Sequence, residues 1–453
     1  MKITNPRGQR KAATVIKSNL GHVTAMQKNK ISQCVLVFMG LFLFGLIGAE
    51  LAVAQTGNPK KTQGAVTNQA REDSRFTQDR FAVGLWVDPP ASVNLDERYA
   101  EIARANFSFI IGIFGASSSN AIARQLELCE KHGLKAIVSM DGQPPNRLPT
   151  HSACWGYFLA DEPGAGAFPE LRKSVDAIRL ARPGKLAYIN LFPNYCPPQA
   201  LGTTDYNEHL RRFVSEVNPD VLSMDHYPQF SPSADGREDY CRNLEAMRRH
   251  SLAAGIPFWN FFNAMPYGPH TDPTEAQLRW QIFTSLAYGA KGVMYFCYWT
   301  PTGDEFPKGG AIITRDGRQT RHYAEAQRIN TAMKNLGPTL MRLTSTGVIR
   351  IKPKEDSAPM LKNTPLRSIS DGDYLISSFH HADGRRALLL NNYHFAYSAW
   401  PTVAFDADAA HVIEVSPKTG KEAPVVDDSP DMPGLQISLD AGEGRLFLLP
   451  PEK

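Results

Sequence analysis

The sequence predicts an α/β fold, a (β/α)8 TIM barrel followed by a C-terminal antiparallel β-sandwich, from three observations. Eight short apolar runs alternate with stretches of helical period between residues 81 and 337. Each run is continuously apolar, as expected of parallel strands buried on both faces. After residue 338 the helical period is lost, and short alternating segments are separated by Gly, Pro, Asp and Asn. A doubly wound sheet would give the same alternation, but the count of eight favours the barrel.

The expected barrel strands are 82–87, 107–114, 134–140, 155–160, 185–192, 220–226, 256–263 and 292–299. Amphipathic stretches between or after them predict helices at 118–132, 168–182, 205–217, 238–254, 274–288 and 320–336. Residues 141–154, between the third and fourth strands, are rich in Pro and polar residues and predict no helix. The barrel is therefore expected at 81–337, with one connection that departs from the βα pattern.

Residues 338–453 predict the β-sandwich, with strands expected at 346–352, 373–380, 386–393, 411–415 and 444–449. Ahead of the barrel, residues 55–80 are polar and predict a flexible linker.

The first 54 residues predict a signal peptide or an N-terminal anchor. A basic region precedes an apolar run from Cys34 to Ala49, and the small residues of Ala52-Val53-Ala54 fit cleavage before Gln55. Export to the periplasm, the medium or the cell surface is therefore expected, with membrane contact only if the leader stays uncleaved. The whole chain has a net charge of +4, and its first 54 residues have a net charge of +6. Residues 55–453 therefore have a net charge of −2, which gives no electrostatic reason to expect a nucleic-acid partner.

The fourth strand ends in two adjacent carboxylates, Asp161 and Glu162, followed by Pro163. The active site of a TIM barrel forms at the C-terminal ends of the strands, and one of two neighbouring carboxylates there can have the raised pKa of a general acid. Glu162 is the best candidate acid, and Asp225 at the sixth strand end is the preferred second carboxylate. Other acids remain open for that second role: Asp88, Asp141 and Glu305.

Aromatic and polar side chains are expected around the same rim, where sugar rings stack on aromatic faces. The expected substrate-binding residues are Trp86, Asp88, Asp141, His226, Tyr227, Trp259, Asn260 and Trp299. No cofactor and no metal site are predicted: the cysteines are scattered, H-E-x-x-H and a phosphate loop are absent from the sequence, and Gly164-Ala165-Gly166 lacks the third glycine of a dinucleotide fingerprint.

The segment WGYFLADEPG resembles the fourth-strand motif of clan A glycoside hydrolases, in which the acid/base Glu follows an Asn and often precedes a Pro. The resemblance implies that Glu162 is the acid/base, with Asp161 in place of the usual Asn. Residues 279–301 resemble the last helix and strand of family 42 β-galactosidases, and residues 443–449 resemble the final strand of the sandwich that often follows such barrels. The resemblance extends loosely over residues 80–450.

One departure concerns the mechanism. Retaining clan A enzymes carry a nucleophilic Glu at the end of the seventh strand, whereas residues 257–264 (PFWNFFNA) contain no acid, and Asn260 or Asn263 stands there. The leading hypothesis is an exported glycosidase that cleaves O-glycosidic bonds of an oligo- or polysaccharide, with its subclass open. The alternatives are a non-catalytic carbohydrate-binding barrel and a structural surface protein with a filled barrel mouth.

Overall fold

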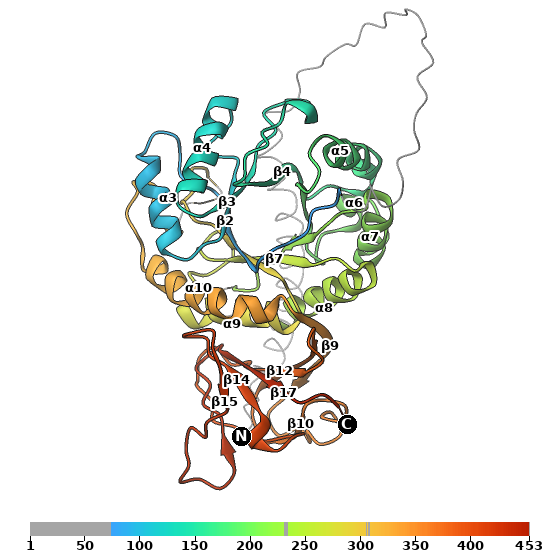
Figure 1. Ribbon diagram of the computed structural model, residues 1–453, viewed down its shortest axis with the longest axis vertical. Coiled ribbons are helices and arrows are strands. Elements are labelled where there is room, and N and C mark those ends of the chain that lie inside the picture. The colour runs from blue at the N-terminus through green and yellow to red at the C-terminus, as the bar shows by residue number, and fades with distance from the viewer. Residues whose placement is uncertain (1–73, 231–233, 305, 307–308, 453) are drawn as a thin grey trace, which may run out of the picture.

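A computed structural model describes residues 74–230, 234–304, 306 and 309–452. Its first part is a ring of eight parallel strands surrounded by helices (Figure 1). The strands are β1 (Ala82–Leu85), β2 (Phe109–Gly112), β3 (Lys135–Val138), β4 (Cys154–Asp161), β5 (Leu186–Leu191), β6 (Leu222–Asp225), β7 (Phe258–Asn263) and β8 (Gly292–Phe296). Strands β2 to β8 pair in chain order, and β8 also pairs with β1. The predicted barrel and its eight strands are confirmed.

Between β1 and β2 the ring is closed by hydrogen bonds between Val83 and Ser108, one of which uses the Ser108 side chain. The Ser108 backbone N–H donates to Val83 O at 2.8 Å, and the Val83 N–H donates to the Ser108 hydroxyl at 2.8 Å. The hydroxyl thus replaces a backbone partner, so the buried amide of Val83 is satisfied without a regular strand pair.

Helices cover the outside of the ring: α3 (Leu95–Arg104), α4 (Ser119–Lys131), α5 (Phe168–Ala181), α6 (Pro198–Leu201), α7 (Tyr206–Arg212), α8 (Arg237–Ala254), α9 (Glu275–Ala287) and α10 (Arg321–Leu340). A single turn of 3-10 helix, Pro145–Arg147, connects β3 to β4. The predicted gap in the βα pattern is therefore confirmed. Helix α10 continues through Gly337 and Pro338 and ends at Leu340, three residues beyond the predicted barrel boundary at 337.

Residues 74–80 cross the N-terminal end of the barrel. Arg75 forms an ion pair with Asp220 at 2.9 Å, and Gln78 donates to Lys291 O at 2.7 Å. Phe76 is buried against Trp155. The expected flexible linker up to residue 80 is therefore wrong for this segment, because one buried ring and two polar anchors fix it beneath the strands. The rest of the linker and the leader lie outside the described residues.

The second part consists of two antiparallel sheets that lie beside α8, α9 and α10 (Figure 1). The larger sheet contains β9 (Leu343–Ile351), β11 (Tyr374–His381), β12 (Arg386–Asn392), β14 (Ile413–Val415), β15 (Glu422–Pro424) and β17 (Gly444–Leu449). The smaller contains β10 (Leu366–Ile369), β13 (Thr402–Phe405) and β16 (Leu435–Gln436). Antiparallel C-terminal sheets are thereby confirmed.

The larger sheet is buried on both faces. Along β12, Ala387 and Leu389 belong to the core shared with the barrel, whereas Leu388 and Leu390 belong to the core shared with the smaller sheet. Alternate side chains of a strand point to opposite faces, so the continuous apolar run of β12 fills two cores. In the part of the chain that the structure describes, no helix has the length and apolar character needed to cross a membrane.

Candidate active site

The end of β4 is irregular, and the irregularity determines where its two carboxylates point. The register with β5 shifts between Phe158 and Ala160, as in a β-bulge. Phe158 faces the barrel interior, where its ring contacts Trp86, and Asp161 faces inward beyond the shift, where it meets Asn190. A bulge is thus what allows both residues, three apart, to face the same way.

Glu162 follows directly in a left-handed backbone conformation with φ of 47°. This region is disfavoured for a side chain larger than that of glycine, at a cost on the order of 1–3 kcal/mol. Its N–H donates to Asn190 O at 2.9 Å, and its side chain is 8% exposed. In a regular strand, the side chains of Asp161 and Glu162 would point to opposite faces of the sheet. The left-handed turn at Glu162 lets both residues lie at the mouth.

Asn190, on β5, joins the carboxylates of β4 and β6. Its amide nitrogen donates to Asp161 Oδ1 at 3.1 Å and to Asp225 Oδ1 at 3.0 Å. Its amide oxygen accepts from the Ser223 hydroxyl at 3.0 Å, which in turn lies 2.8 Å from the Tyr188 hydroxyl. Because Ser223 uses its proton toward Asn190, Tyr188 donates to Ser223. This chain fixes the orientation of the amide, with its two N–H groups toward the two carboxylates.

The two aspartates have raised pKa values. Burial raises the pKa of Asp161 from 3.8 to about 6, against the lowering effect of the Asn190 hydrogen bond. Burial and the nearby charge of Asp161 raise the pKa of Asp225 to about 7, while hydrogen bonds from Asn190 and Tyr227 lower it. Two carboxylates that share one donor repel each other when both are ionised, so they titrate as a pair. Burial and mutual repulsion therefore raise the pKa of both carboxyl groups above the usual value for an aspartate.

Aromatic rings line the mouth around these groups. Trp86 packs among Phe114, Phe158 and Phe261 at centroid distances of 5.3–5.6 Å and forms the floor. Phe114 is 44% exposed, and Phe158 and Asp161 are half-buried, so solvent reaches the floor and the carboxylate.

Tyr227 lies on the side of the mouth formed by β6 and β8. Its ring contacts Phe296 at 5.1 Å and Tyr267 at 5.7 Å, and its hydroxyl binds Asp225. Burial raises the pKa values of Tyr227 and Tyr267 well above their usual range, and the charge of Asp225 raises them further. Both hydroxyls therefore remain protonated, and that of Tyr227 donates to Asp225. Of the predicted site residues, the structure brings Glu162, Asp161, Asp225, Trp86 and Tyr227 together at the mouth.

The other six predicted binding residues make contacts elsewhere. Trp259 is fully buried near the start of β7, where it stacks on Trp155 at 6.0 Å and donates to Gln78 at 2.9 Å. It belongs to the lower barrel core because it is only the second residue of its strand. Asn260 is its neighbour and points outward, donating to Tyr240 and Ser285 of α8 and α9 at 2.6 and 3.0 Å.

Trp299 lies three residues beyond the end of β8 and is 5% exposed. The Arg98 guanidinium from α3 covers its ring at 5.4 Å, so this ring packs outside the strands and does not form a stacking platform. Asp88 is also buried: its carboxylate accepts from the Phe114 and Gly115 N–H groups and from Gln125 at 3.0–3.1 Å. These partners use both oxygens to fasten the β2–α4 loop.

His226 and Asp141 are also turned away from the two aspartates. His226 is outward on the segment after β6, and its ring nitrogen lies 3.0 Å from Asn243 of α8. Asp141 follows β3 and accepts from Ser119, at the start of α4, at 3.0 Å. Both predicted binding roles are replaced by contacts between a strand end and a helix.

The inward positions of β7 are Trp259, Phe261 and, at the strand end, Asn263. Asn263 Oδ1 accepts from the Gln229 N–H at 3.4 Å. Among the described residues, β7 therefore brings no carboxylate to the mouth, as its sequence indicated. Glu305 lies outside the described residues.

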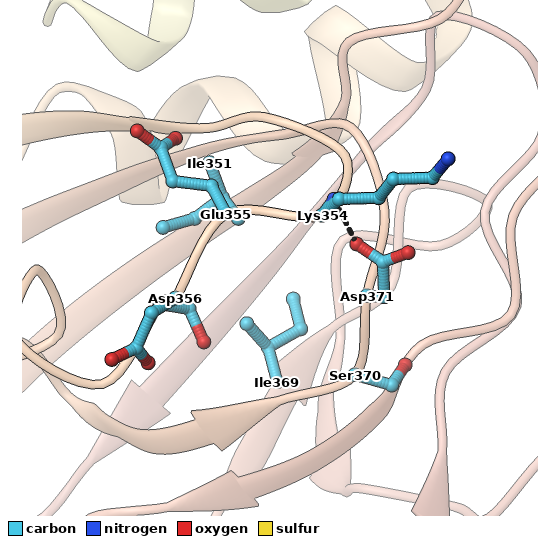
Figure 2. A pocket seen from close by; sticks show the side chains of 8 residues that line it. Ile351, Lys354, Glu355, Asp356, Ile369, Ser370 and Asp371 are labelled. Carbon is cyan, nitrogen blue, oxygen red and sulfur yellow. Dashed lines mark hydrogen bonds between the residues drawn. The ribbon is translucent and has the colours of Figure 1, made fainter.

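Cavities described in the structure lie away from the mouth. One of about 410 Å³ is on the C-terminal sheets, where Glu355, Asp356 and Asp371 surround it and Lys354 N–H donates to Asp371 (Figure 2). Another of about 500 Å³ lies between α7 and α8. Over the described residues, no group of three or more His, Cys, Asp or Glu is placed to hold a metal ion, and none of the five cysteines there forms a disulfide.

Sequence reasoning missed Asn190, Tyr267 and Phe296. A signal for Asn190 was present: it lies two residues after Tyr188 in a predicted strand, so both share a face. Tyr267 lies in a loop, and no periodicity indicates where a loop residue points.

Comparison with known proteins gives similarity in structure alone. No protein-family model matches the chain, and no curated protein matches its sequence. A family 42 β-galactosidase from G. stearothermophilus, Gan42B, matches with a TM-score of 0.56 at 9% identity, over 83% of this chain and 100% of that one. The β-galactosidase from Bacillus circulans sp. alkalophilus gives 0.55 at 10% identity, over 82% and 99%.

The β-galactosidase from the psychrophilic Marinomonas ef1 matches at 11% identity with a TM-score of 0.42, over 56% of this chain. There the chain spans 60% of the relative's length. At such identities the likeness concerns architecture and not catalysis. The chain is thus structurally similar to family 42 β-galactosidases.

Proposed function

We propose that the protein is an exported glycoside hydrolase that cleaves O-glycosidic bonds by carboxylate acid/base chemistry. The observation that carries the proposal is the convergence of Glu162, Asp161 and Asp225 at an aromatic-lined barrel mouth. A general acid must protonate the leaving oxygen, and a second carboxylate assists on the sugar. Glu162 takes the first role because it directly follows Asp161 at the C-terminal end of β4. The aspartate pair supplies the second.

The test compares Glu162→Gln with Glu170→Gln, an exposed glutamate on α5 that pairs with Lys173. Reducing ends released from a panel of oligo- and polysaccharides are measured for the full chain. We expect Glu162→Gln to lower kcat by roughly 10²–10⁴-fold, the usual contribution of a general acid. Aryl glycosides whose leaving group needs no protonation should lose far less, and Glu170→Gln should behave as wild type. An unimpaired Glu162→Gln variant would remove this residue from the reaction.

A non-catalytic carbohydrate-binding barrel is the second candidate. The absence of a carboxylate at the described inward positions of β7 favours it. It would bind members of the panel in calorimetry, release no reducing ends, and retain its affinity in Glu162→Gln.

Export rests on the leader sequence. On expression in a bacterial host, the mature chain should begin at Gln55 and be found outside the cytoplasm, as mass spectrometry of cell fractions would show. An intact leader in the membrane fraction would indicate an anchor, and an intact chain in the cytoplasm would contradict export.

A further inference from the structure

A glycosidase of this kind needs a group that stabilises the anomeric carbon as the leaving oxygen departs. A protein nucleophile lies about 5–5.5 Å from the acid, and a base that activates water lies about 6.5–9.5 Å from it. On β7, the inward positions hold Trp259, Phe261 and Asn263, none of which can form a glycosyl ester. The described residues of this strand therefore offer neither group.

The two aspartates of the mouth are held in a different arrangement. Asp161 and Asp225 are bound to one nitrogen of Asn190, so their Oδ1 atoms are no farther apart than the sum of those two hydrogen bonds. Asp161 also directly precedes Glu162 on the same strand end. A carboxylate next to the acid on the same strand end is better suited to bind a polar substituent beside the anomeric carbon. It is less suited to attack that carbon from the opposite face.

We propose that the substrate is a 2-acetamido-2-deoxyglycoside, whose own acetamido oxygen is the nucleophile, and that Asp161 binds the acetamido N–H. The proposal rests on the proposed function and adds to it the substrate class and the nucleophile. Participation by the substrate replaces the carboxylate that β7 does not supply.

The mouth offers what each part of an acetamido group requires. Half-buried Asp161 is an acceptor for the N–H. The protonated hydroxyl of Tyr267 is a donor for a carbonyl oxygen, while that of Tyr227 donates to Asp225. The aromatic floor, with Trp86 and Phe158, gives the methyl group an apolar surface. A 2-hydroxyl would leave most of these groups unused.

The reaction balances without an external reagent other than water. The acetamido oxygen forms a bond to C1 while the bond from C1 to the leaving oxygen breaks, and Glu162 gives its proton to that oxygen. The cyclic cation passes its N–H proton to Asp161 and becomes a neutral oxazoline. Water then attacks C1 and loses a proton to Glu162, the ring bond to C1 opens, and Asp161 returns its proton to nitrogen. Two inversions retain the anomeric configuration, and the ring closes only if the leaving group is trans to the acetamido group.

Asp225 acts as a positioning residue. It accepts the second N–H of Asn190 and so helps to fix the amide that binds Asp161. This division of roles depends on the shared amide.

The first experiment uses matched 4-nitrophenyl β-glycosides that differ only in a 2-acetamido or a 2-hydroxyl group, in the gluco and galacto series. We expect kcat/KM to be at least about 100-fold higher for the acetamido member of one series, a difference of about 2.7 kcal/mol. Equal rates, or faster cleavage of the hydroxyl member, would overturn the inference and leave the glycosidase proposal standing. No cleavage of any glycoside in the wider panel would end both.

The second experiment tests participation directly. Replacing the acetyl group by mono-, di- and trifluoroacetyl weakens the carbonyl oxygen as a nucleophile, so kcat should fall steeply with each fluorine. A flat series would show that the acetamido group only contributes binding. The stable thiazoline analogue of the cyclic intermediate should inhibit competitively, and absence of inhibition would contradict the intermediate.

Asp161→Asn tests the role of the carboxylate, with Asp176→Asn on exposed α5 as the matched control. We expect Asp161→Asn to lower kcat by roughly 10²-fold and to weaken thiazoline binding, while Asp176→Asn changes neither. Unchanged thiazoline binding in a folded Asp161→Asn variant would contradict the assignment. The wild-type fluorine series does not depend on whether this variant folds.

Discussion

Two arcs of the barrel mouth differ in what they present to a substrate. The arc from β4 to β6 ends in a hydrogen-bonded polar group of Asp161, Asn190 and Asp225. The arc from β7 to β8 presents the rings of Phe261 and Phe296 and, at the end of β7, the amide of Asn263. The carboxyl groups of the mouth are therefore concentrated on one side, and the other side is mostly aromatic.

The difference comes from the direction in which each side chain points. Asp225 and His226 are neighbours after one apolar run, yet Asp225 faces Asn190 in the barrel and His226 faces Asn243 on α8. Asn260 on β7 faces α8 in the same way. A polar residue at a strand end thus belongs to the site only when it has the inward parity.

The largest expected effect is on the β4–β6 arc. Asn190→Leu removes the donor to both carboxylates, and we expect kcat/KM to fall roughly 10³-fold, since a misplaced polar group costs about as much as a lost transition-state donor. The Asn190 hydrogen bonds lower the pKa values of Asp161 and Asp225. Residual activity should therefore have its pH profile shifted upward. A profile that stays in place would show that Asn190 does not control the pair.

A smaller effect is expected at Asp88, which fastens a loop beside the mouth. Asp88→Ala leaves two partly buried backbone N–H groups without their acceptor, and we expect a loss of about 1 kcal/mol in the free energy of unfolding. Asp88→Asn keeps an acceptor, and its amide can donate to Gln125 Oε1, a buried oxygen with no hydrogen-bond partner. Urea denaturation at pH 7 should separate the two variants.

The same pair of variants has a pH signature. Burial raises the pKa of Asp88 from 3.8 to about 7, so between these values the folded chain keeps a proton that the unfolded chain has released. The free energy of unfolding therefore falls as the pH rises from about 4 to 7, and levels off above. Asp161 and Asp225 add slopes of the same sign. Asp88→Asn should remove the contribution of Asp88 to this dependence of the free energy of unfolding on pH. An unchanged dependence would contradict the raised pKa of Asp88.

The smallest effect is expected on the outward side of β7. Asn260→Leu keeps the branching and the number of side-chain heavy atoms, while Tyr240 and Ser285 can still donate to Gln281 O. We expect a change in the free energy of unfolding within about 1.5 kcal/mol and no change in kcat/KM. This variant is the matched control for Asn190→Leu. A loss of activity comparable to that of Asn190→Leu would place Asn260 in the site after all.

Much of the fold was predictable because it depends on pattern. Apolar runs identified all eight barrel strands, and the Pro-rich segment 141–154 identified the connection without a helix. Strands β10 and β13 were missed because each is only four residues long and carries polar residues. Residues 74–80 were predicted to be a linker because their composition is polar. Phe76 is their only large apolar residue, and a single buried ring does not change the composition of a segment.

The sequence by itself determined the order of strands and helices and placed Asp161 and Glu162 at a strand end, because burial of apolar runs depends on local pattern. Only the tertiary structure decided which neighbours converge. A bulge in β4 turns Asp161 inward, and Asn190 binds both Asp161 and Asp225. Asn260, His226 and Trp299 instead contact residues of the surrounding helices. These outcomes depend on strand register and on partners far apart in the chain, which no local pattern contains.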